Sequence, residues 1–335
     1  MTDPTRALQT PVTLLSGWLG AGKTTLLNRL LQNDRGTRYA VLVNEFGEIG
    51  IDDRLIVRSD DDLVELSNGC VCCTIRGDLV ESLKRLRKKR FPWSKRPQFD
   101  RVVLETTGIA EPAPLLRTFL VEDDIATYFR VQSVVTLVDA ANLDAALSHR
   151  SAVEQIALAD LLLLNKSDLV EADALAERET QLRGINPTAN IHPTTQADLP
   201  LHAILEASRR ELPVLPQPED HAHDHAHADG AGHSGIQSIS ITSEVPLDEL
   251  KTRLWLDACV QQLGEDLVRY KGFLHIHGMP YRCVLQGVYD LYSVEAHGEW
   301  TESFPPRTEL VFIGHGLERE FFERGLQAVL SDTTA

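Results

Sequence analysis

Basic residues are scarce in this sequence relative to acidic ones. There are 33 Lys and Arg against 49 Asp and Glu, which gives a formal net charge of −16 at pH 7. Nucleic acids and anionic membrane surfaces are themselves negative, so this balance excludes a general binder of either. We therefore expect neither nucleic acid nor membrane among the partners of this protein.

Long apolar runs are also missing. The first apolar run, at residues 12–15, is too short for the core of a signal peptide and follows a polar start. With 43% hydrophobic and 24% charged residues, the 335-residue chain has the composition of an ordinary globular protein with room for two domains. We expect it to be cytoplasmic.

Cysteine is uncommon, and its distribution is uneven. Of the five cysteines, Cys70, Cys72 and Cys73 lie within four positions, which does not resemble a disulfide framework. In a reducing cytosol such a cluster favours a metal site. The other two, Cys259 and Cys283, lie among apolar residues and are predicted to be part of a core.

Short apolar runs alternate with longer amphipathic ones through the first two-thirds of the chain. Strands are predicted at residues 12–16, 40–44, 102–105, 134–139 and 161–165. Helices are predicted at residues 24–32, 78–90, 114–119 and 172–183. Continuous apolar strands separated by helices indicate an α/β domain with a mostly parallel sheet.

A stretch with three prolines, at residues 212–218, ends this alternation. It leads into a polar tract that holds five of the twelve histidines, His221, His223, His225, His227 and His233. The tract has too few apolar residues to fold alone. We predict a nucleotide-binding domain at 1–210, a linker at 211–235 and a smaller α+β domain at 236–331.

The smaller domain is predicted to have a mostly antiparallel sheet. Its strands are expected at residues 236–242, 272–277, 281–289 and 309–313, and its helices at 247–263 and 317–330. His275 and His277 have strand spacing, so they would share one face of that sheet. We interpret both histidines as ordinary sheet residues and not as metal ligands.

Residues 17–25, Gly-Trp-Leu-Gly-Ala-Gly-Lys-Thr-Thr, match the phosphate-binding P-loop motif, G-x-x-x-x-G-K followed by S or T. The motif follows an apolar strand and opens a helical pattern, as it must. Its glycines let backbone N–H groups surround phosphate oxygens. Lys23 would neutralise the β and γ phosphates, and Thr24 would place its hydroxyl on Mg²⁺. The predicted nucleotide-binding residues here are Gly17, Gly20, Ala21, Gly22, Lys23, Thr24 and Thr25.

Two later segments point to guanine and to the γ phosphate. Residues 165–168, Asn-Lys-Ser-Asp, end an apolar strand and resemble the guanine-reading motif of GTPases, in which the carboxylate, here Asp168, accepts from N1–H and the 2-amino group. Asn165 and Lys166 complete that motif. Glu105, at the end of another strand, can hold Mg²⁺ or its water, and Gly108 can offer its N–H to the γ phosphate. We assign catalysis to Lys23, Thr24 and Glu105.

The cysteine cluster is predicted to bind a metal ion. Thiolates are ligands that suit Zn²⁺ or Cu(I), and zinc normally takes four ligands. Three sulfurs leave one position for a carboxylate, a water or a client protein, as a transfer site would need. Glu45 or Glu48, in the loop where a first switch would lie, could supply that ligand or touch Mg²⁺; a solvated loop is the alternative.

These motifs in this order resemble the CobW-type metallochaperone GTPases, which include zinc-regulated GTPase metalloprotein activators and relatives of the cobalt-insertion accessory protein of cobalamin synthesis. The resemblance covers most of the chain, and Gly-Cys-x-Cys-Cys at residues 69–73 is its most specific part. The other matching segments are 17–25, 44–48, 105–112, 165–168, the His-rich linker and Leu-Val-Phe-Ile-Gly-His-Gly-Leu at 310–317.

The resemblance implies a GTPase that holds Zn²⁺ on the three cysteines beside the nucleotide and delivers it to a client apo-metalloprotein. The short Cys-Pro docking segment of the eukaryotic zinc-transfer members is not seen near the N-terminus, so their client is not implied. Three alternatives stay open: delivery of Co²⁺ to a corrin or nitrile-hydratase-type client, an ATP-dependent small-molecule kinase, and a non-enzymatic zinc buffer. The chain could be a monomer or a homodimer.

Overall fold

The computed structural model describes residues 9–33, 37–44, 55–59, 62–66, 75–88, 99–109, 112–200, 203–204 and 235–331. The chain divides into two compact units, one built mainly from residues 2–180 and 189–211 and the other mainly from residues 212–335. The linker predicted at 211–235 lies almost entirely outside the described residues. The boundaries of the two domains therefore stay a prediction.

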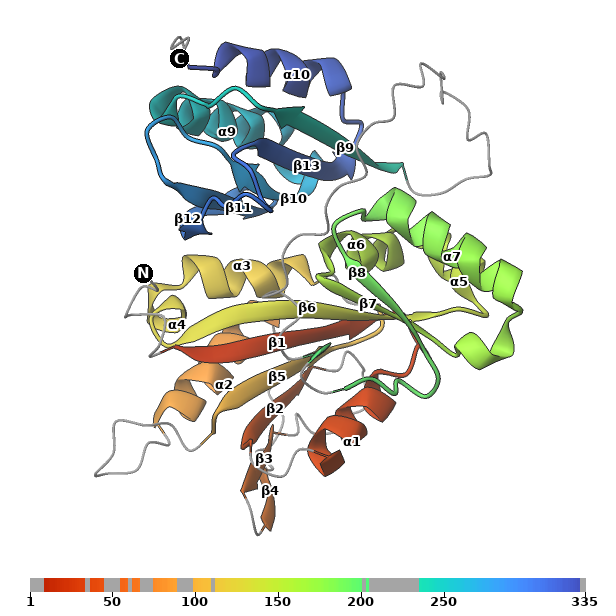
Figure 1. Ribbon diagram of the computed structural model, residues 1–335. Helices are drawn as coiled ribbons and strands as arrows, with labels where there is room; N and C mark the ends of the chain where they lie inside the picture. Colours follow the sequence, from red (N-terminus) through yellow and green to blue (C-terminus); the bar gives the residue numbers. More distant parts are fainter. Residues whose placement is uncertain are drawn as a thin grey trace. The chain divides into compact units, whose positions relative to one another are not determined.

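The first unit is built on an eight-stranded sheet with the order β4-β3-β2-β5-β1-β6-β7-β8 (Figure 1). Six neighbouring strands, from β2 to β8 in that order, run parallel, whereas β3 and β4 add an antiparallel hairpin at one edge. The mostly parallel α/β sheet predicted from the sequence is thus confirmed. The strands are β1 (Thr10–Gly17), β2 (Tyr39–Asn44), β3 (Leu55–Ser59), β4 (Asp62–Leu66), β5 (Arg101–Thr106), β6 (Phe129–Asp139), β7 (Leu161–Asn165) and β8 (Asn190–Thr194).

Helices cover both faces of this sheet (Figure 1). Four leucines of α1 pack with Val135 and Leu163, so α1 covers one face. Thr136 points the other way and its hydroxyl donates to the carbonyl of Gln155 in α6, which covers the opposite face. The helices are α1 (Lys23–Asn33), α2 (Ile75–Lys88), α3 (Ala113–Val121), α4 (Asp123–Ala126), α5 (Leu143–Leu147), α6 (Arg150–Leu158), the 3-10 turn η2 (Ser167–Leu169) and α7 (Ala172–Ile185).

The second unit has a fully antiparallel five-stranded sheet with the order β12-β11-β10-β13-β9. Its two long helices share a core with the sheet around Tyr270, Phe312 and Phe322, which confirms the predicted α+β class. The elements are β9 (Ile236–Ser243), α9 (Glu249–Leu263), the 3-10 turn η4 (Gly264–Asp266), β10 (Leu267–Leu274), β11 (Tyr281–Val288), β12 (Leu291–Glu299), β13 (Thr308–His315) and α10 (Arg319–Ala328).

The bounds of the strand predicted at 272–277 are wrong, because the observed strand β10 starts and ends earlier in the chain. β10 ends at Leu274, so His275 and His277 follow the strand and do not share one of its faces. The His275 N–H donates to the Thr308 hydroxyl and the His277 N–H donates to Leu247 O, so neither extends the backbone ladder between β10 and β13. The polar residues Arg269 and Lys271 concealed the true start of the strand, because both are buried within it.

The two isolated cysteines are core residues, as predicted. Cys259 and Cys283 are buried in the second unit. Burial raises the pKa of the Cys259 thiol to about 12, so the sulfur stays a neutral thiol at physiological pH. Cys283 donates to the thioether of Met279 at 3.6 Å. Both thiols therefore serve packing.

Candidate nucleotide-binding site

The predicted P-loop connects β1 to α1 and has three glycines with positive φ, of which two lie too close to neighbouring atoms for a Cβ. Gly17 has φ +140°, and a Cβ there would lie 2.4 Å from Leu137 O. Gly22 has φ +111°, and a Cβ there would lie 2.5 Å from Asn165 Nδ2. Only glycine fits either position without a shift of the neighbouring strand ends. The loop is thereby held against the carboxyl ends of β6 and β7.

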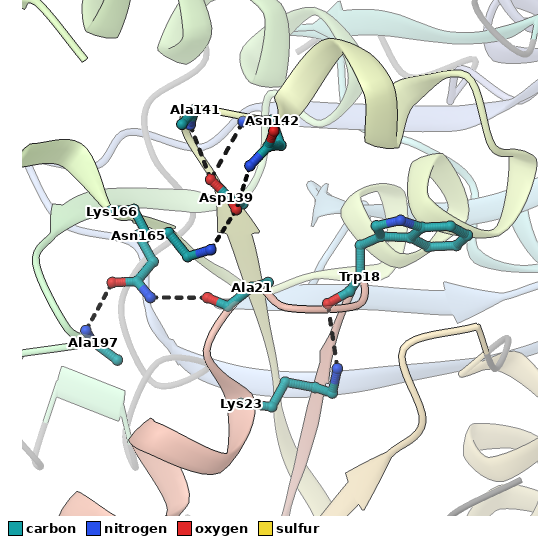
Figure 2. A network of polar contacts seen from close by, with 9 residues as sticks. All are labelled: Trp18, Ala21, Lys23, Asp139, Ala141, Asn142, Asn165, Lys166 and Ala197. Atoms are coloured by element: carbon teal, nitrogen blue, oxygen red, sulfur yellow. Dashed lines mark hydrogen bonds and ion pairs between the residues drawn. The ribbon is translucent and has the colours of Figure 1, made fainter. Parts of the chain in front are cut away.

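Lys23 is the first residue of α1, and its ammonium group lies inside the loop. Nζ donates to Gly17 O at 2.7 Å. It also donates to Trp18 O at 3.4 Å (Figure 2). Burial lowers the pKa of Lys23, and the charge of Glu105 partly opposes this shift. Thr24 and Thr25 are exposed on the first turn of the helix. Positive charge and exposed hydroxyls thus meet at one helix N-terminus, a favourable setting for phosphate.

The end of β5 brings the predicted second switch beside the P-loop. Glu105 pairs in register with Leu15 of β1 and is 7% exposed. Thr106 Oγ1 donates to Leu15 O and to Ser16 Oγ, both at 3.4 Å. Two residues later, a Cβ at Gly108 would lie 2.7 Å from Leu19 N, so glycine is required for this close approach.

Asn165 joins the predicted guanine motif to the P-loop. At the end of β7, its Nδ2 donates to Ala21 O at 2.8 Å (Figure 2). Its Oδ1 accepts from Ala197 N at 2.8 Å and from Thr194 Oγ1 at 3.3 Å. Both ends of the side-chain amide are therefore used, and Asn165 fixes the two loops on either side of it.

Lys166 is held by an acidic residue that the sequence analysis did not single out. Lys166 adopts the left-handed conformation, with φ 60°, and its Nζ donates to Asp139 Oδ2 at 2.6 Å. Asp139 also accepts from Asn142 Nδ2 at 2.9 Å and from the N–H groups of Ala141 and Asn142 at 3.0 and 3.3 Å (Figure 2). Burial opposes ionisation of this carboxyl, but the hydrogen bonds from Lys166 and Asn142 outweigh it and lower the pKa of Asp139.

Asp168 lies beyond this network, in η2, and is exposed. The preceding Ser167 anchors the turn, because its hydroxyl donates to Thr194 O at 3.0 Å. Asp168 is therefore exposed at the surface, in a turn anchored to the end of β8.

The structure thus brings the P-loop, Glu105, Gly108 and the 165–168 segment together at the carboxyl edge of the parallel sheet. The sequence analysis missed Asp139, Asn142, Ala197 and Gln155. For Asp139 a signal existed, since it ends a predicted apolar strand, as Asn165 does; in the structure the two residues are paired in register.

The predicted metal residues lie outside the described residues: Glu45, Glu48, Cys70, Cys72, Cys73, His221, His223, His225, His227 and His233. Among the residues that the structure does describe, no group of three or more His, Cys, Asp or Glu could hold a metal ion. No helix in that same part of the chain is long and apolar enough to cross a membrane.

Comparison with protein-family models gives two matches. Residues 11–193 match the CobW/HypB/UreG nucleotide-binding domain, and residues 236–330 match the cobalamin synthesis protein cobW C-terminal domain. The two matches flank the His-rich segment and correspond to the parallel and the antiparallel sheets.

Curated proteins and solved structures point the same way. The zinc chaperone YjiA of Escherichia coli is 35% identical over 314 residues, covering 92% of this chain and 95% of that protein. The zinc-regulated GTPase metalloprotein activator 1 of Schizosaccharomyces pombe is 39% identical over 197 residues, covering 56% of this chain and 46% of that protein. A crystal structure of Zn(II)-bound YjiA GTPase from E. coli superimposes with a TM-score of 0.74 at 29% identity, covering 96% of this chain and 99% of that one.

Proposed function

We propose that this chain, which belongs to the CobW/HypB/UreG family and is a GTPase, binds zinc and passes it to a client metalloprotein under the control of GTP. One observation carries the nucleotide part of this proposal. The Asn165 side chain bonds to Ala21 of the P-loop and to Ala197, so the base-reading and phosphate-binding segments form one site.

In this site we assign each end of GTP to its own residues. Lys23 faces the β and γ phosphates, and Gly108 offers its N–H to the γ phosphate. Asp168 accepts from N1–H and the 2-amino group of guanine, which adenine cannot match. Lys166, held by Asp139, lies beside the base. An ATP-dependent kinase would have no use for that carboxylate.

The residues at the phosphate end fit Mg²⁺. The Thr24 hydroxyl and the Glu105 carboxylate are hard oxygen donors of the kind that this ion prefers. When bound, Mg²⁺ would neutralise charge on the β and γ phosphates. The protein's own part is to position GTP and to stabilise developing charge with Lys23 and backbone N–H groups.

For the metal cargo we propose the loop with Cys70, Cys72 and Cys73. Relatives named as zinc chaperones support zinc as the ion. Three thiolates leave one of the four usual zinc positions for an acceptor, which suits transfer more than storage. Hydrolysis of GTP would relax the switch segments that flank this loop and favour release to the client. The His-rich tract would collect metal near the loop.

Replacing one cysteine tests the metal site. Cys72→Ser should weaken zinc binding by more than about 100-fold, because loss of an outer-shell partner alone costs 10–100-fold. The measurement is competition with a chromophoric zinc chelator, repeated with Co²⁺ to rank the two metals. Cys283→Ala is the matched control, since this thiol is buried in the core of the second unit, and it should leave affinity unchanged. Unchanged zinc affinity in Cys72→Ser would refute the proposed site.

A further inference from the structure

Helix α6 lies beside the nucleotide site at two points, although no recognised nucleotide motif includes it. His149, just before the helix, stacks its ring on the indole of Trp18 in the P-loop, with centroids 4.5 Å apart and planes 20° from parallel. One and a half turns further along, Gln155 Nε2 donates to Gly108 O at 3.1 Å. The helix therefore contacts the phosphate loop and the second switch at the same time.

The Gln155 side chain is held in place from several sides. It is 1% exposed, and its helix packs Val153, Ile156 and Leu158 into the core. The Thr136 hydroxyl of β6 donates to Gln155 O at 3.0 Å, which fixes the helix backbone on the sheet at this residue. A buried amide on a packed helix has few rotamers to choose from. The Nε2 donor is therefore a fixed point against which the switch can rest.

Gly108 is the acceptor in this contact. Without a Cβ, it can rotate its two flanking peptide groups more freely than other residues. The backbone of Leu19 closes one side of the glycine, since a Cβ there would lie 2.7 Å from Leu19 N. On the side of α6, the Gln155 side chain donates a hydrogen bond to the carbonyl of Gly108. The two contacts hold the Gly108 turn between the P-loop and α6.

We infer that Gln155 is a positioning residue for GTP hydrolysis, which holds the Gly108 turn so that its N–H meets the γ phosphate. The inference rests on the proposed role of Gly108. GDP has no γ phosphate, so binding of GDP does not depend on this contact. Gln155 therefore acts on the GTP-bound state and on the hydrolysis step.

Gln155→Met removes the donor and keeps most of the side-chain volume. We expect kcat for GTP to fall about tenfold, because one buried hydrogen bond to the switch is lost. Affinity for GDP should change by less than about twofold, and the ratio of affinities for a non-hydrolysable GTP analogue and GDP should fall. Phosphate release at saturating GTP and Mg²⁺ gives kcat, and titration with labelled nucleotides gives the affinities.

Two further variants make the experiment decisive. Gln155→Glu keeps the shape but replaces the donor with an acceptor, and it should lose at least as much activity. Glu154→Gln is the matched control: it changes the neighbouring buried residue of α6, whose carboxylate accepts from Arg150 Nε at 2.8 Å, and should leave kcat unchanged. Equal losses of GTP and GDP affinity in Gln155→Met, or an unchanged kcat, would overturn the inference.

Gly108→Ala separates this inference from the proposed function. Its Cβ would collide with Leu19 N, so hydrolysis should be lost while GDP binding persists. Hydrolysis lost in Gly108→Ala but normal in Gln155→Met overturns only the role of Gln155. Hydrolysis retained in Gly108→Ala overturns the role of Gly108 itself.

Discussion

The two ends of the proposed nucleotide site are built differently. At the proposed base end, two side chains are fixed by bonds to other side chains and to backbone: the Asn165 side chain makes three hydrogen bonds and the Asp139 carboxylate makes four. At the phosphate end, contacts come from backbone in a glycine-bearing loop, and the Lys23 ammonium donates to carbonyls of that same loop. The side chains of the base end are thus held in place by several hydrogen bonds. The phosphate end instead depends on the charge of Lys23 and on the switch segment that contains Gly108.

The difference assigns separate tasks to the two ends. A network whose members are already bonded costs little to order on binding, so the proposed base end can hold the base of GTP and of GDP alike. The phosphate end must respond to the presence of the γ phosphate. Burial lowers the pKa of Lys23. The negative charge of a bound phosphate would oppose this shift, because it favours the protonated ammonium group. Changes at the phosphate end should therefore alter catalysis, and changes at the base end should alter affinity.

The largest effect is expected at the phosphate end. Lys23→Ala should lower kcat/KM for GTP by roughly 100-fold or more, since a charge that stabilises the transferring phosphoryl group is removed. Steady-state phosphate release measures this. Lys84→Ala is the control, because Lys84 forms an exposed ion pair with Asp124 on the surface and should behave like the unmodified protein. A kcat/KM within about twofold in Lys23→Ala would remove Lys23 from the site.

A smaller and more uniform effect is expected at the base end. Asp139→Asn takes away the charge that holds Lys166 and should weaken GTP and GDP binding equally, by about tenfold. At saturating GTP, kcat should stay within about twofold. Asp144→Asn is the control, since this exposed carboxylate pairs with Arg178 on the surface. A selective loss of GTP affinity would break the division between the two ends.

The parts of the site that the sequence predicted are those encoded by consecutive residues. The P-loop takes nine positions in a row and the guanine motif four, so each can be recognised before any fold is known. The contact of Asp139 with Lys166 spans 27 residues and needs the parallel pairing of β6 and β7. Gln155 gave no signal, because a glutamine within a short helix has no motif that marks its partner.

The fold was predicted to a similar extent. Apolar strands buried on both faces, such as β7, were predictable because they read as continuous apolar runs. Strand β12 was missed because most of its residues are exposed, and its place is set by pairing with β11. Helix α6 was missed because its apolar residues mix with Glu154 and Gln155, which are buried in the fold. The positions of β12 and α6 therefore depend on tertiary contacts, and the local sequence pattern does not reveal them.

The central claim is that the nucleotide controls the metal. The most direct measurement is the zinc affinity of the full-length protein, by chelator competition, with GDP and with a non-hydrolysable GTP analogue, each with Mg²⁺. We predict that zinc is bound at least about tenfold more tightly with the GTP analogue, a coupling of about 1.4 kcal/mol. Equal zinc affinity in the two nucleotide states would contradict the account.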